Sequence, residues 1–161
     1  MARLLVVHHS PTPTVRRLTE SVLSGAGDDA IEGVEVVVRE ALAATAQDVL
    51  GADGYLLGTT ANFGYMSGAL KHFFDSIFLE AGGALSDDGS ASPAGDGKKP
   101  YGLWVHGRYD TTGAVRSVQS IVGALPWRQS APVLEVLGDP TDVDLEAAYE
   151  LGGTLAALVS G

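Results

Sequence analysis

The sequence contains no cysteine, few aromatic residues (7%) and only 10 Lys and Arg against 20 Asp and Glu. Without cysteine the chain can form no disulfide, iron–sulfur cluster or reactive thiol. The net charge of −10 excludes a general nucleic-acid binder and argues against adhesion to anionic membranes. No apolar run approaches the roughly 20 residues that span a bilayer, and the apolar start is too short for a signal peptide. We therefore expect a soluble, cytoplasmic protein.

The residues that are present favour a globular α/β domain. Short apolar runs typical of buried parallel strands alternate with segments whose apolar residues recur at helical spacing. This alternation implies right-handed crossovers and a three-layer α/β/α sandwich. We expect a five-stranded parallel sheet in the flavodoxin-like order 2-1-3-4-5. The predicted strands, in chain order, are Leu4–His8, Val34–Val38, Gly54–Gly58, Tyr101–Val105 and Val133–Leu137.

One segment, residues 82–98, interrupts the alternation because it is rich in Gly, Ser and Asp and almost lacks large apolar residues. Such a composition cannot offset its ordering entropy by burial, so we expect a flexible insertion within a single domain spanning residues 1–161. A solvated insertion without a role and a flap near the site both remain open.

Ligands of open α/β sheets bind beyond the carboxyl ends of the strands, where the strand order switches. Three predicted loops meet there: Ser10–Thr14, Thr59–Gly64 and His106–Gly113. The first carries three hydroxyls just before a helix that we expect to begin near Val15, which suits a phosphate group. The same residues could equally form an ordinary helix cap.

The second loop carries Phe63, Gly64 and Tyr65, which together suit a flat aromatic ligand, unless the aromatic rings fold into the core. The third adds Arg108 and Tyr109. We expect no metal site, because His8 and His9 point to opposite faces at a strand end. In the flanking segments, Trp104 is expected in the core and Trp127 at the surface or in an oligomer contact.

Residues 58–75, GTTANFGYMSGALKHFFD, resemble the flavin-ring loop of flavodoxin-like FMN proteins. The resemblance is strongest to NAD(P)H:quinone oxidoreductases of the tryptophan-repressor-binding-protein type and to NADPH-dependent FMN reductases, and in element order it covers nearly the whole chain. It implies FMN as cofactor, NAD(P)H as electron donor, and ping-pong hydride transfer through flavin N5 to a quinone or similar small acceptor. No catalytic side chain is implied.

Carried over by position, the resemblance assigns a set of cofactor-binding residues. They are Ser10, Thr12, Thr14 and Val15 for the phosphate, Thr59, Thr60, Ala61, Asn62, Phe63 and Gly64 for the ring and ribityl chain, and Gly107, Tyr109 and Gly113 for the other edge of the ring. His106 ends the predicted fourth strand beside the ring, where it could donate to a flavin carbonyl or orient a quinone. For His106, a purely structural role is equally open. Two departures stand out: Pro13 replaces the usual Gly, and Gly107-Arg108-Tyr109 replaces adjacent glycines.

Two other functions remain open at this point. A flavodoxin-type electron carrier would use its acidic surface to dock a redox protein partner. A flavodoxin-like module that has lost its chemistry would fail to take up FMN. A homo-oligomer is also compatible with the sequence.

Overall fold

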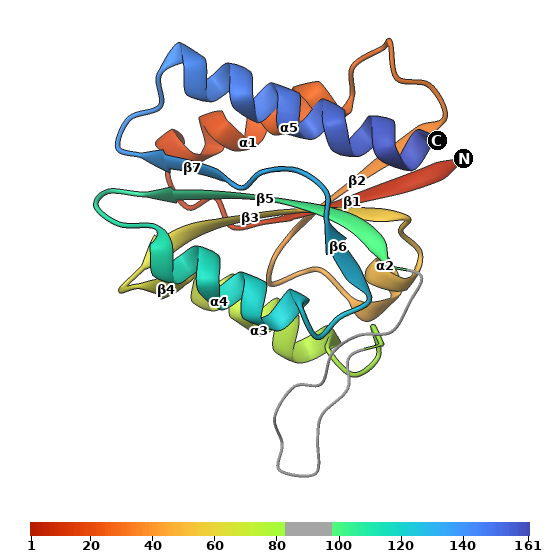
Figure 1. Cartoon of the computed structure of the whole chain (residues 1–161), viewed down its shortest axis with the longest axis horizontal. Coiled ribbons are helices and arrows are strands. Elements are labelled where there is room, and N and C mark those ends of the chain that lie inside the picture. Colours follow the sequence, from red (N-terminus) through yellow and green to blue (C-terminus); the bar gives the residue numbers. More distant parts are fainter. Residues whose placement is uncertain (83–97) are drawn as a thin grey trace.

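A sheet lies between two layers of helices in the computed structural model, which describes residues 1–82 and 98–161 (Figure 1). The parallel strands β2 (Val34–Glu40), β1 (Ala2–His8), β3 (Gly54–Asn62) and β5 (Lys99–Gly107) are neighbours in that order. Beyond β5, two short strands, β6 (Trp127–Gln129) and β7 (Leu134–Leu137), pair with its first and last parts. The predicted sandwich and its strand order are therefore confirmed, with β7 as the predicted fifth strand.

Helices cover both faces of this sheet (Figure 1). The helices α1 (Pro13–Ala26) and α5 (Asp142–Ser160) lie on one face, and α2 (Ala46–Leu50), α3 (Gly68–Ile77) and α4 (Thr112–Val122) lie on the other. Side chains of β1 alternate between the two cores: Leu4 and Val6 pack toward α1 and α5, whereas Leu5 and Val7 pack into the other cluster. This burial on both faces explains why β1 is a continuous apolar run.

The segment predicted as a loop after the third strand is largely a hairpin. Strand β3 continues through Thr59–Asn62 and pairs antiparallel with β4 (Tyr65–Met66). The two residues between the strands, Phe63 and Gly64, have φ values of 52° and 75°. Positive φ at both positions is typical of the tight turn whose twist matches a hairpin. The loop prediction was wrong here because the antiparallel partner strand supplies the pairing that the apolar pattern does not reveal.

Two further expectations are corrected by the structure. Trp127 is buried in β6, where its ring stacks on Tyr55 with centroids 4.1 Å apart, so the prediction of a surface or oligomer contact is wrong. Helix α1 begins at Pro13, two residues before the expected start near Val15, because proline fits the first helical position. Trp104 is buried as predicted.

The insertion predicted at residues 82–98 coincides with residues 83–97, which lie outside the described residues. Within the described ranges, no helix has the length and apolarity needed to cross a bilayer.

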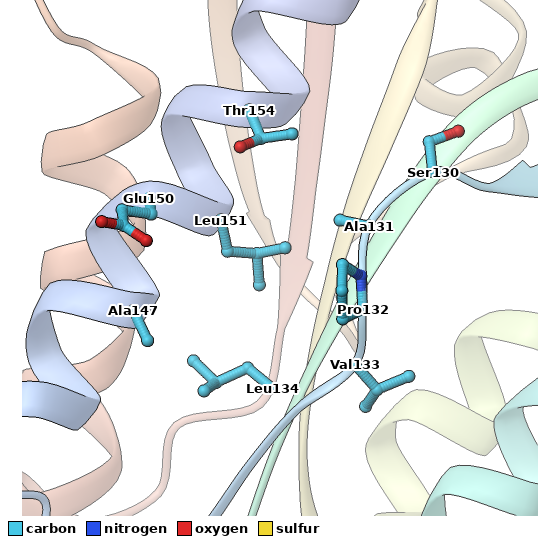
Figure 2. A pocket seen from close by; sticks show the side chains of 9 residues that line it. All are labelled: Ser130, Ala131, Pro132, Val133, Leu134, Ala147, Glu150, Leu151 and Thr154. Carbon is cyan, nitrogen blue, oxygen red and sulfur yellow. The ribbon is translucent and has the colours of Figure 1, made fainter.

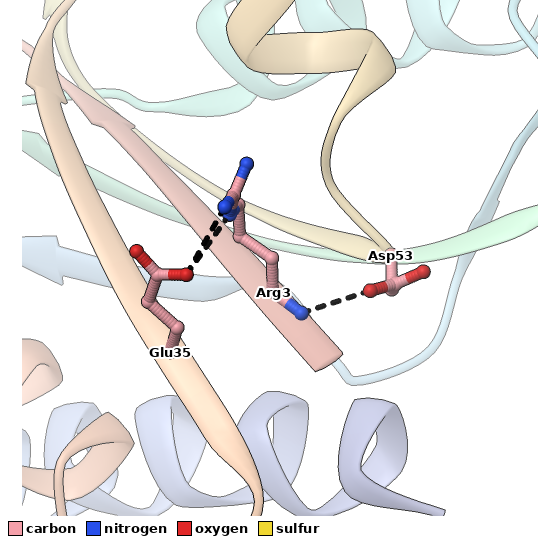
Figure 3. A network of polar contacts seen from close by, with 3 residues as sticks. All are labelled: Arg3, Glu35 and Asp53. Atoms are coloured by element: carbon pink, nitrogen blue, oxygen red, sulfur yellow. Dashed lines mark hydrogen bonds and ion pairs between the residues drawn. The ribbon is translucent and has the colours of Figure 1, made fainter. Parts of the chain in front are cut away.

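A polar network ties the amino-terminal end of β1 to its neighbours (Figure 3). The Arg3 guanidinium donates to a carboxylate oxygen of Glu35 on β2 through Nε (3.2 Å) and Nη2 (3.1 Å). The backbone N–H of Arg3 donates to Asp53, just before β3, at 2.8 Å. Because the ion pair is about half exposed, it stabilises the fold by at most about 1 kcal/mol. The network as a whole connects the starts of β1, β2 and β3 at the edge of the sheet opposite the cleft-forming carboxyl ends.

Helices α1 and α5 approach so closely that their contact has no room for side chains at two glycines. A Cβ atom on Gly152 would overlap the carbonyl oxygen of Val22, and one on Gly25 would overlap that of Tyr149. Backbone cannot move aside as a flexible side chain can, so this contact specifically requires glycine. The adjacent Gly153 differs, since a Cβ there would meet its nearest atom, the Gly25 oxygen, at an ordinary 3.5 Å.

Replacing each of these two neighbouring glycines of α5 by alanine should therefore change the free energy of unfolding in opposite directions. Gly152→Ala should lower the free energy of unfolding by about 2 kcal/mol because the helices must separate. Gly153→Ala should raise it by about 0.5–1 kcal/mol through better helix propensity. Urea unfolding followed by circular dichroism measures both, and equal effects of the two substitutions would contradict the close contact.

Candidate functional site

A cleft of about 240 Å³ lies where the carboxyl ends of β1, β3 and β5 meet. The strand register creates it, because His8 pairs with Gly58 and Thr60 pairs with His106. All three predicted loops contribute to its wall. The predicted site residues that line it are Thr12, Val15, Thr60, Ala61, Asn62, His106 and Gly107.

The first turn of α1 forms one end of this cleft. Thr12 caps the helix, and its Oγ1 accepts the backbone N–H of Val15 at 3.3 Å. Pro13 occupies the first helical position and carries no N–H, so the turn offers one donor fewer than usual. The Thr14 amide is the first-turn donor that neither the helix nor its cap uses. The helix end thus suits an anion, although its supply of donors is small.

The Ser10 hydroxyl, predicted to bind phosphate, is occupied by a chain of internal hydrogen bonds. Thr19 donates to the carbonyl of Val15 (3.2 Å), so its oxygen must accept from Ser10 (2.7 Å). The Ser10 oxygen, having donated its one proton, accepts from Nδ1 of His8 at 2.9 Å. Ser10 does not line the cleft but a neighbouring pocket beside Glu40.

The β3–β4 hairpin supplies two threonines with contrasting roles. Thr59 Oγ1 is buried, accepts the backbone N–H of Ser67 at 2.9 Å and donates to the carbonyl of Thr60 at 2.8 Å. Thr60 lines the cleft, but its Oγ1 is shielded from solvent and has no hydrogen-bond partner in the described part of the chain. An unpaired buried hydroxyl costs free energy that a ligand can recover.

The aromatic residues of the hairpin do not fold into the core, so that alternative interpretation is wrong. Phe63 is fully exposed at the turn, and Tyr65 is partly exposed. Gly64 packs against the start of α4, where a Cβ on Gly113 would overlap the Gly64 carbonyl oxygen. Phe63, Gly64 and Gly113 therefore lie at the hairpin tip and beneath it, outside the cleft lining.

The β5–α4 loop places one histidine firmly at the cleft. His106 is buried, and its Nε2 lies 2.7 Å from the carbonyl oxygen of Gly138. Since a carbonyl only accepts, Nε2 carries a proton and donates it to this bond. The N-cap residue of the helix that follows is Thr111, whose hydroxyl donates to Glu135 at 2.7 Å instead of capping the helix. The preceding Asp110 accepts the Thr112 N–H at 3.0 Å. Tyr109 is exposed beyond the cleft lining.

The charge of the cleft contrasts with that of the whole chain. Among the described residues that line it, none is Asp or Glu, whereas His9, His106 and Arg108 are present. The chain as a whole carries a net charge of −10. Arg16 adds a cation nearby, with its guanidinium 3.4 Å from the carbonyl oxygens of Ser10 and Pro11. The cleft thus favours an anionic ligand more than the rest of the chain does.

His9, Pro11 and Arg108 line the cleft but are missing from the predicted site residues. Each directly adjoins a predicted position, so the predicted loops were informative about location. Which side chains of a loop face inward depends on its three-dimensional path, which composition does not encode. In the described ranges, no group of three or more His, Asp or Glu residues could hold a metal ion.

A second cavity, of about 300 Å³, lies between α5 and the segment joining β6 to β7 (Figure 2). Its wall is mostly apolar, with Pro132, Val133, Leu134 and Leu151 among its members. It lies away from the three loops and brings together no set of polar groups comparable to the first cleft. The cleft at the carboxyl ends is therefore the better candidate site.

Comparison with solved structures identifies the fold as flavodoxin-like. A flavodoxin from the domain Archaea superimposes with a TM-score of 0.78 at 18% identity and covers 99% of both chains. A flavodoxin, WrbA-like protein from Agrobacterium tumefaciens superimposes with a TM-score of 0.67 at 16% identity and covers 99% of this chain and 98% of that one. At these identities the likeness defines the fold.

The sequence comparison gives a partial match to a flavodoxin from Aquifex aeolicus (strain VF5), with 34% identity over 85 residues. That match covers 53% of this chain and 45% of the relative, so the chain spans less than half of the relative's length. No family model matches the chain. The flavodoxin-like part of the resemblance is confirmed, whereas the narrower resemblance to quinone and FMN reductases stays a prediction.

The His8 environment predicts how stability depends on pH. Burial lowers the pKa of His8 and outweighs the opposing charge of Glu40, while His9 lowers the pKa further. The folded state therefore binds fewer protons than the unfolded state, whose His pKa is about 6.5. Stability should be fully present above that pH and fall as the pH drops through the folded-state pKa. His8→Gln should flatten this dependence between pH 7.5 and 5.

The control for this experiment is His72→Gln, which removes an exposed histidine on α3. Urea unfolding across the pH range should give the wild-type slope for that variant. If both variants keep the wild-type slope, His8 titrates no differently in the folded and unfolded states.

Proposed function

We propose that this chain binds FMN in the cleft at the carboxyl ends of β1, β3 and β5 and functions in electron transfer. The unpartnered Thr60 hydroxyl carries the proposal, because it is a buried polar group of a residue that lines the cleft. Native structures rarely leave such a group unpaired. A ring carbonyl, ring nitrogen or ribityl hydroxyl of the cofactor would complete its hydrogen bonding.

The remaining residues of the cleft fit the two chemically different parts of FMN. The first turn of α1, with Thr12, Thr14 and the nearby Arg16, would hold the phosphate. The hairpin wall and Gly107 would flank the ring, and Phe63 and Tyr109, exposed on the two segments that continue beyond the lining, offer aromatic surface for stacking. When bound, FMN supplies both one-electron and hydride chemistry, while the protein binds and orients it.

The first candidate role is that of an electron carrier. The names of the relatives support it, since both the partial sequence match and the archaeal structure are called flavodoxins. The net charge of −10 would help such a carrier dock a redox partner with a basic surface.

The second candidate role is an NAD(P)H-dependent oxidoreductase that passes electrons to a quinone or similar small acceptor. The motif at residues 58–75 supports it, and so does the absence of carboxylates among the described residues lining the cleft. A nicotinamide dinucleotide is an anion, and carboxylates around the flavin would repel it. In this role His106 would orient the acceptor. A homo-oligomer and a cytoplasmic location are further expectations for either role.

One experiment separates these roles. The purified protein is loaded with FMN, freed of unbound flavin, and mixed with NADH or NADPH without oxygen while the flavin absorbance is followed. Rapid bleaching that a quinone reverses would establish the oxidoreductase. Retained FMN that stays oxidised with both nucleotides would establish the carrier as the better description. Failure to retain FMN would contradict the proposal, and Pro13 would then account for the weakened phosphate site.

The two hairpin threonines provide a matched test of cofactor binding. Thr60→Val removes a hydroxyl that has no partner, so the stability of the free protein should not fall. Its dissociation constant for FMN should rise about fivefold to tenfold, the equivalent of one hydrogen bond. Fluorescence quenching of FMN measures this constant.

Thr59→Val serves as the control for structure. It leaves the buried Ser67 N–H unpaired, so the free energy of unfolding should fall by about 1–2 kcal/mol. If Thr60→Val leaves FMN binding unchanged, the cofactor does not use the cleft wall as proposed.

A further inference from the structure

Arg108 is a cation at the ring side of the cleft. It follows Gly107 at the end of β5, next to the hairpin wall formed by Thr60, Ala61 and Asn62. The Arg108 side chain is 58% exposed, and its guanidinium lies 3.5 Å from Asp139, whose side chain is 83% exposed. Exposed ion pairs of this length are weak, so a ligand can recruit the guanidinium at little cost.

Among the described residues that line this cleft, Arg108 is the one fixed cation, and none is Asp or Glu. His9 and His106 line it together with Arg108. The carboxylates nearest in the sequence to these loops are held by other contacts: Asp110 accepts the Thr112 N–H, and Glu135 accepts the Thr111 hydroxyl. Asp139 is the carboxylate that contacts the Arg108 guanidinium, at 3.5 Å.

We propose that Arg108 raises the reduction potential of FMN bound in this cleft, and that Asp139 moderates this effect. The inference rests on the proposed binding of FMN. Full reduction at neutral pH adds two electrons and one proton to the oxidised ring, which leaves the ring with one additional negative charge. A cation beside the ring stabilises this reduced form more than the oxidised form.

The consequence concerns the choice of electron donor. A less negative potential makes reduction by a mild two-electron donor more favourable, and makes the reduced cofactor a weaker reductant. The Arg108 side chain thus biases the cleft toward accepting electrons from a small-molecule hydride donor rather than supplying low-potential electrons. This cation is present because Gly107-Arg108-Tyr109 stands where the resembling family has adjacent glycines.

The test compares three variants of the full chain loaded with FMN: Arg108→Gln, Asp139→Asn and Arg128→Gln. Arg128 is an exposed residue of β6, and it pairs with the opposite end of β5, so it matches the charge change away from the cleft. Reduction potentials are measured by anaerobic titration with dithionite against reference dyes. Affinities for oxidised FMN are measured separately.

Arg108→Gln should reduce the preference for reduced over oxidised FMN about tenfold, which corresponds to a potential about 30 mV more negative for a two-electron couple. Asp139→Asn should shift the potential in the opposite direction, and Arg128→Gln should shift it least. A shift for Arg108→Gln no larger than that for Arg128→Gln, or of the opposite sign, would overturn the inference and leave FMN binding intact. If the wild-type chain binds no FMN, the proposed function fails and the inference falls with it.

Discussion

The central position of β3 between β1 and β5 determines where chemistry can occur in this protein. Its parallel pairing on both sides brings the ends of three strands to one edge, so that Thr60 stands opposite His106 and Gly58 stands beside His8. The loops that follow these strands therefore lie next to one another at that edge. Strand β1 is buried on both faces, and the glycine contact brings α1 and α5 close together on one of them.

Much of the fold could be predicted because most helices and strands are marked by residue patterns within their own short segments. Continuous apolar runs marked the parallel strands, and helical spacing marked the covering layers. The start of α2 is also set locally, since Thr45 and Asp48 form a capping box there. What could not be predicted depends on partners distant in the sequence. The three-residue strand β6 exists because β5 pairs with it, and Trp127 is buried because Tyr55, some 70 residues earlier, offers a stacking surface.

The candidate site was predictable to the level of loops but not of atoms. Ser10 lies in the correct loop, yet its hydroxyl joins His8 and Thr19 in a series of hydrogen bonds. This contact depends on how the loop packs against α1, which the residue pattern does not indicate. Thr59 and Thr60 are adjacent and chemically identical, but the alternation of a strand sends one hydroxyl to Ser67 and leaves the other unpartnered at the cleft. Arg108 matters for the same reason, since its importance depends on which charges surround it.

The binding of FMN at the carboxyl ends of β1, β3 and β5 can be followed residue by residue by titrating ¹⁵N-labelled protein with FMN and recording the amide chemical shifts. If FMN binds in this cleft, the largest changes cluster at Thr12, Thr14, Thr60, Gly107 and Arg108, with little change in the segment that lines the second cavity, Ser130–Leu134. Changes centred on that second segment, or none at any residue, would contradict binding in this cleft.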